Sequence, residues 1–264
     1  PNMSTNPQRL IPSIVKKYLM AITGLVLSLF VLGHMVGNLQ YFMGPDVINA
    51  YALELHSLPF HLLWVIRAFL ATCLVVHVIM AVLLVQENRA ARGGAAYEGA
   101  THKAATWSAK LMPVSGVILL VYVVFHLLHF TLRVGPGEYA QDIGDAHFML
   151  HGEMAHFFDV YAMMFVGFKH IGTSLFYILA VGMLCMHLSH GVASMFQSLG
   201  FRNETTRYKF EKFALAYGWI VFLGFASIPA SVLVLGTGSE YVNEKAVNEA
   251  DDAFFDSLPV DLND

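Results

Sequence analysis

Six histidines lie within long apolar stretches of the sequence, where an ionisable side chain is costly and therefore suggests a function. They are His34, His77, His126, His129, His187 and His190. A single histidine in such a place most often hydrogen-bonds to a neighbouring helix. Two facing imidazoles at one depth, however, can supply both axial ligands of an iron porphyrin. The positions of the histidines along the apolar stretches therefore decide between the two interpretations.

Five apolar stretches are long enough for a membrane-spanning helix, which needs roughly 20 residues to cross the hydrocarbon core. Only one charged residue, Arg67, lies in them. Charged residues make up 13% of the whole chain, against about 25% in a typical soluble domain. The sequence therefore predicts an all-α fold, an integral membrane bundle of five transmembrane helices. The stretches cover residues 22–42, 62–85, 111–132, 171–201 and 213–239.

Lysine and arginine are concentrated in alternate connections between these stretches. Eleven of the fifteen lie before the first helix, between the second and third, or between the fourth and fifth. Because cytoplasmic connections are enriched in lysine and arginine, we expect a cytoplasmic N-terminus and an outside C-terminus. We divide the chain into a transmembrane domain, residues 1–240, and an acidic extracytoplasmic tail, residues 241–264.

The depth of the histidines in the bundle places four of them on two levels. His77, His126 and His187 each come 15 or 16 residues after the start of their apolar stretch, and His34 comes 16 residues after Tyr18, where the first helix leaves its basic flank. At 1.5 Å per residue, each lies about 22–24 Å from the surface at which its helix enters. Because successive helices run in opposite directions, His34 and His126 share an outer level. His77 and His187 share an inner level, roughly 15 Å away.

Two pairs of imidazoles on two levels predict two bound haems. Zinc sites prefer four protein ligands, or three and a water, so two histidines per level do not suit zinc. The sequence has no Cys-x-x-Cys-His motif, so the haems would be held without thioether bonds, as haem b. Spacing alone leaves open whether His126 or His129, and His187 or His190, is the ligand on its helix.

Together these residues resemble the cytochrome b subunit of succinate:quinone oxidoreductases, in the single-subunit, two-haem class that includes bacterial quinol:fumarate reductases. The resemblance covers about residues 10 to 236. It implies that His34 and His126 bind the haem distal from the cytoplasm, and that His77 and His187 bind the proximal haem. His129 and His190 would be hydrogen-bonding neighbours. The matching segments are Ile22-Thr23-Gly24 ahead of Gly33-His34-Met35, Ser57-Leu58-Pro59-Phe60, Gly116 ten residues before His126, and His187-Leu188-Ser189-His190-Gly191 followed by Gly200.

The resemblance also implies partners and a place in the cell. The family anchors a flavoprotein subunit and an iron–sulfur subunit on the cytoplasmic face of the bacterial inner membrane, and we expect docking on the basic connections 86–110 and 202–212. Electrons would pass between the iron–sulfur subunit and a quinone, menaquinone rather than ubiquinone, as in complex II of the tricarboxylic acid cycle. Lipid and quinone are expected partners, and nucleic acid is not. The chain has no dinucleotide fingerprint and no cysteine set for a cluster, so succinate would react on the partner subunits.

A quinone site needs an apolar slot with a few polar groups that exchange protons. Near the outer histidines the candidates are Glu54, His56, Arg67 and Asn38. Glu54 is the expected proton-exchanging group, because its Leu-Glu-Leu context resembles that of a glutamate implicated in quinol chemistry in fumarate-reducing relatives. Some of those relatives also carry a membrane glutamate two residues before the last haem ligand. Cys185 stands at that position here, so a built-in proton path is not expected.

Two other functions and one other site stay open at this stage. The chain could be the dihaem cytochrome of a formate dehydrogenase, hydrogenase or nitrate reductase type of complex, or a haem-free transporter. In the long connection 134–169, we expect residues 147–168 to form a helix at the membrane interface. His147 and His151 have the spacing of zinc ligands on a helix, so a metal site with Glu153 and His156 is the alternative to a plain polar face.

Overall fold

The computed structural model describes residues 11–92, 107–134 and 144–257. Five long helices dominate it, and each is long and apolar enough to cross a membrane, alone or with the short helical turn beside it. The predicted multi-pass helical membrane fold is confirmed in this respect, whereas the side of the membrane on which each terminus lies stays a prediction. The five are α1 (Ser13–Leu39), α3 (Leu62–Arg92), α4 (Trp107–His126), α6 (Ile171–Ser198) and α7 (Arg207–Leu235).

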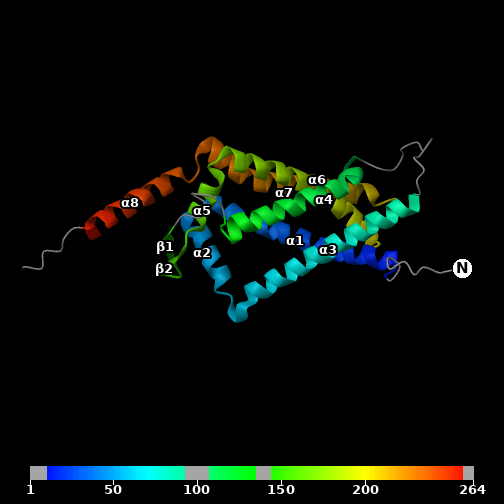
Figure 1. Cartoon of the computed structure of the whole chain (residues 1–264), viewed down its shortest axis with the longest axis horizontal. Coiled ribbons are helices and arrows are strands. Elements are labelled where there is room, and N and C mark those ends of the chain that lie inside the picture. The colour runs from blue at the N-terminus through cyan, green and yellow to red at the C-terminus, as the bar shows by residue number, and fades with distance from the viewer. Residues whose placement is uncertain (1–10, 93–106, 135–143, 258–264) are drawn as a thin grey trace, which may run out of the picture.

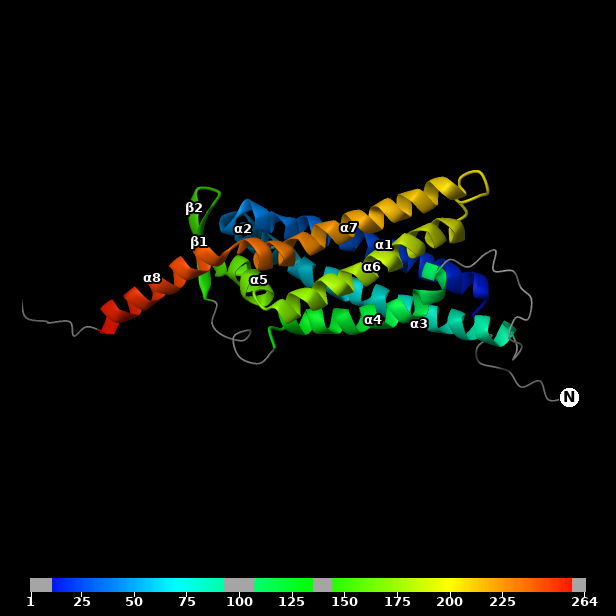
Figure 2. The ribbon, with the colours of Figure 1, turned by 90° about the horizontal axis from the view of Figure 1, so that it is seen from above.

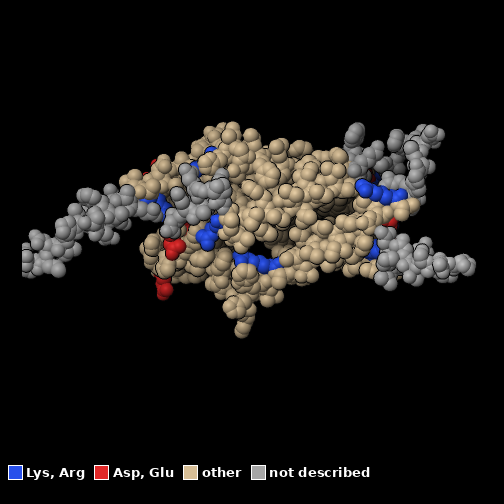
Figure 3. All heavy atoms as spheres, in the orientation of Figure 1, with Lys and Arg blue, Asp and Glu red and all other residues tan. Residues whose placement is uncertain are grey.

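The long helices run side by side along the long axis of the molecule (Figures 1 and 2). α6 and α7 form the most extensive pair, α1 packs against α3, α6 and α7, and α4 packs mainly against α6. The first half of α3 leans away from the other helices (Figure 1). Lys, Arg, Asp and Glu atoms are scarce over the middle of the face drawn in Figure 3, as a surface in contact with lipid requires.

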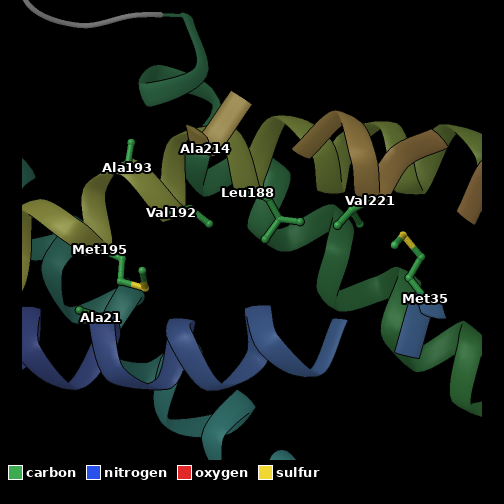
Figure 4. Packing of buried hydrophobic residues seen from close by; sticks show 8 residues of the cluster. All are labelled: Ala21, Met35, Leu188, Val192, Ala193, Met195, Ala214 and Val221. Atoms are coloured by element: carbon green, nitrogen blue, oxygen red, sulfur yellow. The ribbon is translucent and has the colours of Figure 1, made fainter. Parts of the chain in front are cut away.

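A core of buried apolar side chains joins α1, α6 and α7 (Figure 4). Close approach of α7 to α6 depends on Gly218, where a Cβ atom would lie 2.8 Å from the carbonyl oxygen of Cys185. Small residues are the usual means of such close packing between membrane helices. The core consists of Ala21, Met35, Leu188, Val192, Ala193, Met195, Ala214 and Val221.

Shorter elements gather at one end of the bundle, which we call the hairpin end (Figures 1 and 2). The opposite end, where α1 begins, α3 ends and residues 199–206 join α6 to α7, is called the connection end. α8 extends away from the bundle at the hairpin end. The hairpin end contains α2 (Pro45–His56), β1 (Asp145–Leu150), β2 (Glu153–Phe158), α5 (Val160–Phe168) and α8 (Ser239–Ser257). Three helical turns complete the fold, η2 (Gln40–Met43), η3 (Pro59–His61) and the π-helical η4 (Leu127–Thr131).

The interfacial helix expected over residues 147–168 is wrong for its first half. β1 and β2 form an antiparallel hairpin in which His147 faces His156. His151 and Gly152 both have positive φ, 53° and 87°, which suits the tight turn of a hairpin and stops a helix. Only α5 is helical in this segment. The all-α prediction therefore holds for the bundle and fails for this hairpin.

A buried carboxylate, Asp159, ties the hairpin end together. Its side chain caps α5 by accepting a hydrogen bond from the backbone N–H of Ala162 at 2.9 Å, and it accepts another from Asn49 of α2 at 3.2 Å. From α8, Tyr241 donates its hydroxyl at 2.8 Å and Lys245 its ammonium at 3.0 Å. Burial, followed by the neighbouring Asp159, raises the pKa of Tyr241. The expected tail boundary at residue 240 thus falls within a helix whose first turns are bound to the bundle.

Candidate functional site

The histidines of α1 and α4 meet near the hairpin end. The ring centroids of His34 and His126 lie 5.8 Å apart, with the rings nearly perpendicular at 79°. One metal held about 2 Å from a nitrogen of each ring would put the centroids roughly 6 Å apart, so the separation fits two axial ligands of one iron. We call these two residues the hairpin-side pair.

Aromatic rings surround the hairpin-side pair. Phe30 stacks on His34 with centroids 5.4 Å apart, and Phe225 lies 5.8 Å away on another side. Tyr122 and Phe130 lie 5.9 and 5.7 Å from the ring of His126. Such a setting is apolar and flat-sided, which suits a planar macrocycle and keeps water away from it.

The polar partners of the hairpin-side pair are few. Among the described residues, Nδ1 of His126 is the buried side-chain nitrogen that has no hydrogen-bond partner. The amide of Asn38 lies 3.3 Å from Nε2 of His34, and it donates a hydrogen bond to the backbone carbonyl of the same residue at 2.7 Å. An unpaired buried nitrogen is rare in proteins and needs an explanation, and a ligand in the site would provide one.

The histidines of α3 and α6 form the second pair, His77 and His187, which we call the connection-side pair. The two rings are close enough to interact electrostatically. Each Nδ1 also faces a hydroxyl on another helix, that of Thr23 at 3.2 Å for His77 and that of Ser115 at 3.1 Å for His187. Both rings are therefore held in position from a neighbouring helix.

Glycines leave room beside the connection-side pair. A Cβ atom at Gly24 would lie 3.2 Å from Cε1 of His77, and one at Gly116 would lie 3.8 Å from Cε1 of His187. Each glycine directly follows one of the two hydroxyl residues in the sequence. A larger side chain at either position would occupy space next to the ring, where a bound group must also fit.

The two pairs lie on separate levels. Thr23, which contacts His77, precedes His34 by eleven residues on α1. Eleven residues are close to three full turns of helix, so the two side chains share a face and lie about 16 Å apart along the axis. The structure therefore brings together the histidines that the depth argument paired, on two levels separated by about the distance expected.

The two remaining membrane histidines have other surroundings. His129 is buried in the π-helical turn η4, where its Nδ1 lies 3.0 Å from the hydroxyl of Tyr177. His190 lies one turn after His187 on α6 and interacts electrostatically with Arg202. Both arrangements suit the neighbouring roles that the resemblance implies for these two residues.

The expected quinone residues do not converge, apart from Asn38. Glu54 lies on the exposed side of α2, and its carboxylate is 3.3 Å from Nε2 of His151 in the hairpin. The guanidinium of Arg67 lies over the ring of Trp64 at 4.9 Å, and His56 lies 2.8 Å from a carbonyl oxygen of its own helix. In the described part of the chain, none of these three candidates hydrogen-bonds or ion-pairs with the hairpin-side pair.

The alternative of a metal site in the outer connection has no support. The hairpin places His147 opposite His156, with ring centroids 6.1 Å apart, while His151 turns toward Glu54. Over residues 11–92, 107–134 and 144–257, no three histidine, cysteine or acidic side chains are grouped so that they could hold a metal ion. The helical spacing of His147 and His151 has no meaning in a hairpin.

Thr23 and Ser115 are site residues that the sequence argument overlooked. A signal for them exists, because the first and third apolar stretches share one pattern. In both, a hydroxyl residue and a glycine stand ten to eleven residues before the histidine, as Thr23-Gly24 before His34 and Ser115-Gly116 before His126. This spacing alone does not reveal that each hydroxyl contacts a histidine of the long helix that follows in the sequence, His77 of α3 or His187 of α6.

Comparisons with known proteins found no match to this chain among protein-family models, curated proteins or solved structures. What the site offers chemically is two pairs of imidazoles on two levels of a bundle whose helices are apolar enough to span a membrane.

Proposed function

We propose that this chain is the membrane-anchoring cytochrome b subunit of a succinate:quinone oxidoreductase. In this proposal it holds two haems b and passes electrons between an iron–sulfur partner subunit and a membrane quinone. The observation that carries the proposal is the pairing of four histidines from four helices on two levels, with ring centroids 5.8 Å apart in the hairpin-side pair. Four histidines that served only in packing would have no reason to form two such pairs.

The residues of the chain have distinct tasks in this proposal. His34 and His126 would ligate one iron, and His77 and His187 the other. A haem bound at each level would supply reversible one-electron transfer. Aromatic walls around the hairpin-side pair exclude water, while the hydroxyls and glycines beside the connection-side pair orient its rings and leave space.

The orientation and the partners belong to the proposal as well. The connection end carries basic side chains, among them Lys17, Lys209 and Lys212, and would face the cytoplasm of a bacterium by the positive-inside rule. The flavoprotein and iron–sulfur subunits would dock there. The quinone would then react near the hairpin-side pair, where Asn38 contacts His34.

Two other functions would use the same fold differently. A cytochrome of a formate dehydrogenase, hydrogenase or nitrate reductase type would keep both haems and change the partner. A haem-free transporter would use the histidines for packing. The unpaired Nδ1 of His126 counts against the transporter, because an unsatisfied polar group inside a membrane is costly and a histidine used only for packing would be expected to form a hydrogen bond.

Isolation of the intact complex tests the proposal. The full chain, affinity-tagged and extracted from its native membrane in mild detergent, should bring with it one flavoprotein and one iron–sulfur protein. Succinate should then reduce both haems and an added menaquinone analogue. Co-purification with a formate, hydrogen or nitrate enzyme would favour the second function, and a chain without haem or partners would favour the third. A preparation of the His34→Ala/His77→Ala double variant is the control, and succinate should reduce no haem in it.

A further inference from the structure

The hydroxyls of Thr23 and Ser115 occupy equivalent places in the two halves of the connection-side site. Thr23 belongs to α1 and lies 3.2 Å from Nδ1 of His77, while Ser115 belongs to α4 and lies 3.1 Å from Nδ1 of His187. Each hydroxyl precedes the glycine beside which the same ring lies. Two unrelated packing contacts would not both place a hydroxyl at Nδ1 of a histidine and a glycine directly after the hydroxyl residue.

The proton of each hydroxyl is already engaged. Thr23 donates to the carbonyl oxygen of Leu19 at 2.7 Å, and Ser115 donates to that of Met112 at 3.0 Å. A hydroxyl has one proton to donate and lone pairs with which to accept. Each oxygen can therefore only accept from the imidazole that it faces, which requires the proton of that ring to be on Nδ1.

We infer that Thr23 and Ser115 are positioning residues that fix His77 and His187 as the Nδ1–H tautomer and so present Nε2 to the iron. This inference rests on the proposed function. A metal-binding histidine commonly donates its other N–H to an oxygen, which fixes the ring and makes it a more basic ligand. Here the acceptor hydroxyl is itself held by a backbone carbonyl one turn earlier in its helix.

The hairpin-side pair lacks such an acceptor. In the described part of the chain no hydroxyl hydrogen-bonds either ring, Nδ1 of His126 is unpaired, and the group beside the ring of His34 is the NH2 of Asn38, which can donate but not accept. The two iron sites therefore differ in the basicity of their ligands. Because a more basic ligand favours the ferric state, the hydroxyls lower the midpoint potential of the connection-side haem and leave the other unchanged.

Redox titration of the purified, haem-loaded complex tests the inference. Thr23→Val keeps the shape of the side chain and removes the hydroxyl, which leaves the ring of His77 with the backbone of Met20 as its hydrogen-bond partner. Ser115→Ala removes the hydroxyl at the other ring. Both variants should shift the midpoint potential of the same haem upward, while the second haem titrates as in the wild type. Thr23→Ser restores the hydroxyl and should restore the potential. Loss of that one haem in Thr23→Val, with its retention in Thr23→Ser, would also support the positioning role.

Two matched controls make the same chemical changes away from the site. Thr72→Val removes a hydroxyl on α3 that donates to the carbonyl of Ala68, and Ser227→Ala removes one on α7 that donates to the carbonyl of Gly224. Over the described residues, neither hydroxyl hydrogen-bonds a histidine, so neither control should move a potential.

Two results would overturn the inference while leaving the proposed function intact. One is two bound haems with unchanged potentials in both site variants. The other is a shift of different haems by the two variants, since His77 and His187 would then not share an iron. A wild-type chain without haem would instead overturn the proposed function itself, before any variant is compared.

Discussion

The rings of His34 and His126 lie 5.8 Å apart although their helices, α1 and α4, pack mainly on other helices. The two imidazoles of the hairpin-side pair therefore face each other across a space between helices that do not pack closely. α3 and α6, which carry His77 and His187 of the connection-side pair, likewise pack mainly on other helices.

Replacement of one histidine should remove one haem and spare the other. His126→Ala or His34→Ala should leave one haem per chain, that of the connection-side pair, because an iron that loses one of its two axial ligands is held weakly. His77→Ala or His187→Ala should leave the other. The pyridine haemochrome assay gives the number of haems per chain. The haem that remains in the His34 and His126 variants should differ in midpoint potential from the haem that remains in the His77 and His187 variants. His129→Ala, which removes a buried histidine outside both pairs, is the control and should keep two. A single replacement that removed both haems or neither would refute the pairing.

A large side chain at Gly24 should damage the connection-side site. The Cβ atom alone would lie 3.2 Å from Cε1 of His77, which is tighter than an ordinary contact, so a leucine there should displace the ring. Gly24→Leu should therefore lose one haem per chain while the hairpin-side haem stays. Gly172→Leu is the matched control, because nothing lies within 4 Å of a Cβ at that glycine. Equal haem contents in the two variants would contradict the expectation.

Loss of the Asp159 carboxylate should loosen the hairpin end. Asp159→Ala removes the carboxylate that accepts from both Lys245 and Tyr241, and breaking a buried ion pair in this way costs roughly 3 kcal/mol. Thermal unfolding in detergent should occur at a lower temperature, and hydrogen exchange in the first turns of α8 should become faster. Glu244→Ala removes an exposed carboxylate of the same helix and should change stability by less than about 0.5 kcal/mol. If both variants unfold alike, the cluster does not hold α8.

Alkaline pH should weaken the same attachment. Burial and the nearby Asp159 raise the pKa of Tyr241 in the folded protein. The contribution to stability is therefore complete below the ordinary tyrosine pKa of about 10 and declines as pH rises above it, because the unfolded chain ionises first. In Tyr241→Phe, the protection of α8 against proteolysis should depend less on pH between 9 and 11, because the phenol that ionises is absent. An identical pH profile in the variant would show that ionisation of Tyr241 is not linked to the attachment of α8.

Turnover should generate a membrane potential if the quinone reacts at the hairpin end. Electrons would then cross between the two levels, and no proton path is evident in α6, where Cys185 is buried against Gly218 and the helix carries no acidic residue. In sealed proteoliposomes, an uncoupler should accelerate succinate-dependent quinone reduction and abolish the dye signal for the potential. Equal rates with and without uncoupler, together with no potential, would mean that charge movement is compensated.

The sequence was sufficient to predict the features that follow from long-range periodicity and depth. Five apolar runs predicted five helices, and counting from each helix start placed the four histidines on two levels that the structure also shows. Helix rise and bilayer thickness are the same in every such bundle and do not depend on tertiary detail, so spans and depths follow from the sequence. Which of His126 and His129 faces His34 could be seen only in the structure, where a π-helical turn begins directly after His126 and His129 contacts Tyr177.

Other features depend on contacts that no local pattern encodes. The hairpin was missed because apolar and polar residues alternate only weakly over residues 145–158. Its turn also requires a positive φ at His151, a conformation that a histidine in the sequence does not predict. Sequence context predicted Glu54 near the quinone, but in the structure its carboxylate pairs with His151 of the hairpin. Thr23 and Ser115 could be recognised only once the helices that oppose them were known.

The most direct test of the central claim is the reduced-minus-oxidised absorption spectrum of the purified chain, with haem and protein quantified in the same sample. Four histidines in two bis-imidazole sites predict a spectrum of b type and two haems per polypeptide. A chain that contains no haem when isolated from its native membrane would contradict the account, and one haem per chain would mean that only one of the two pairs binds iron.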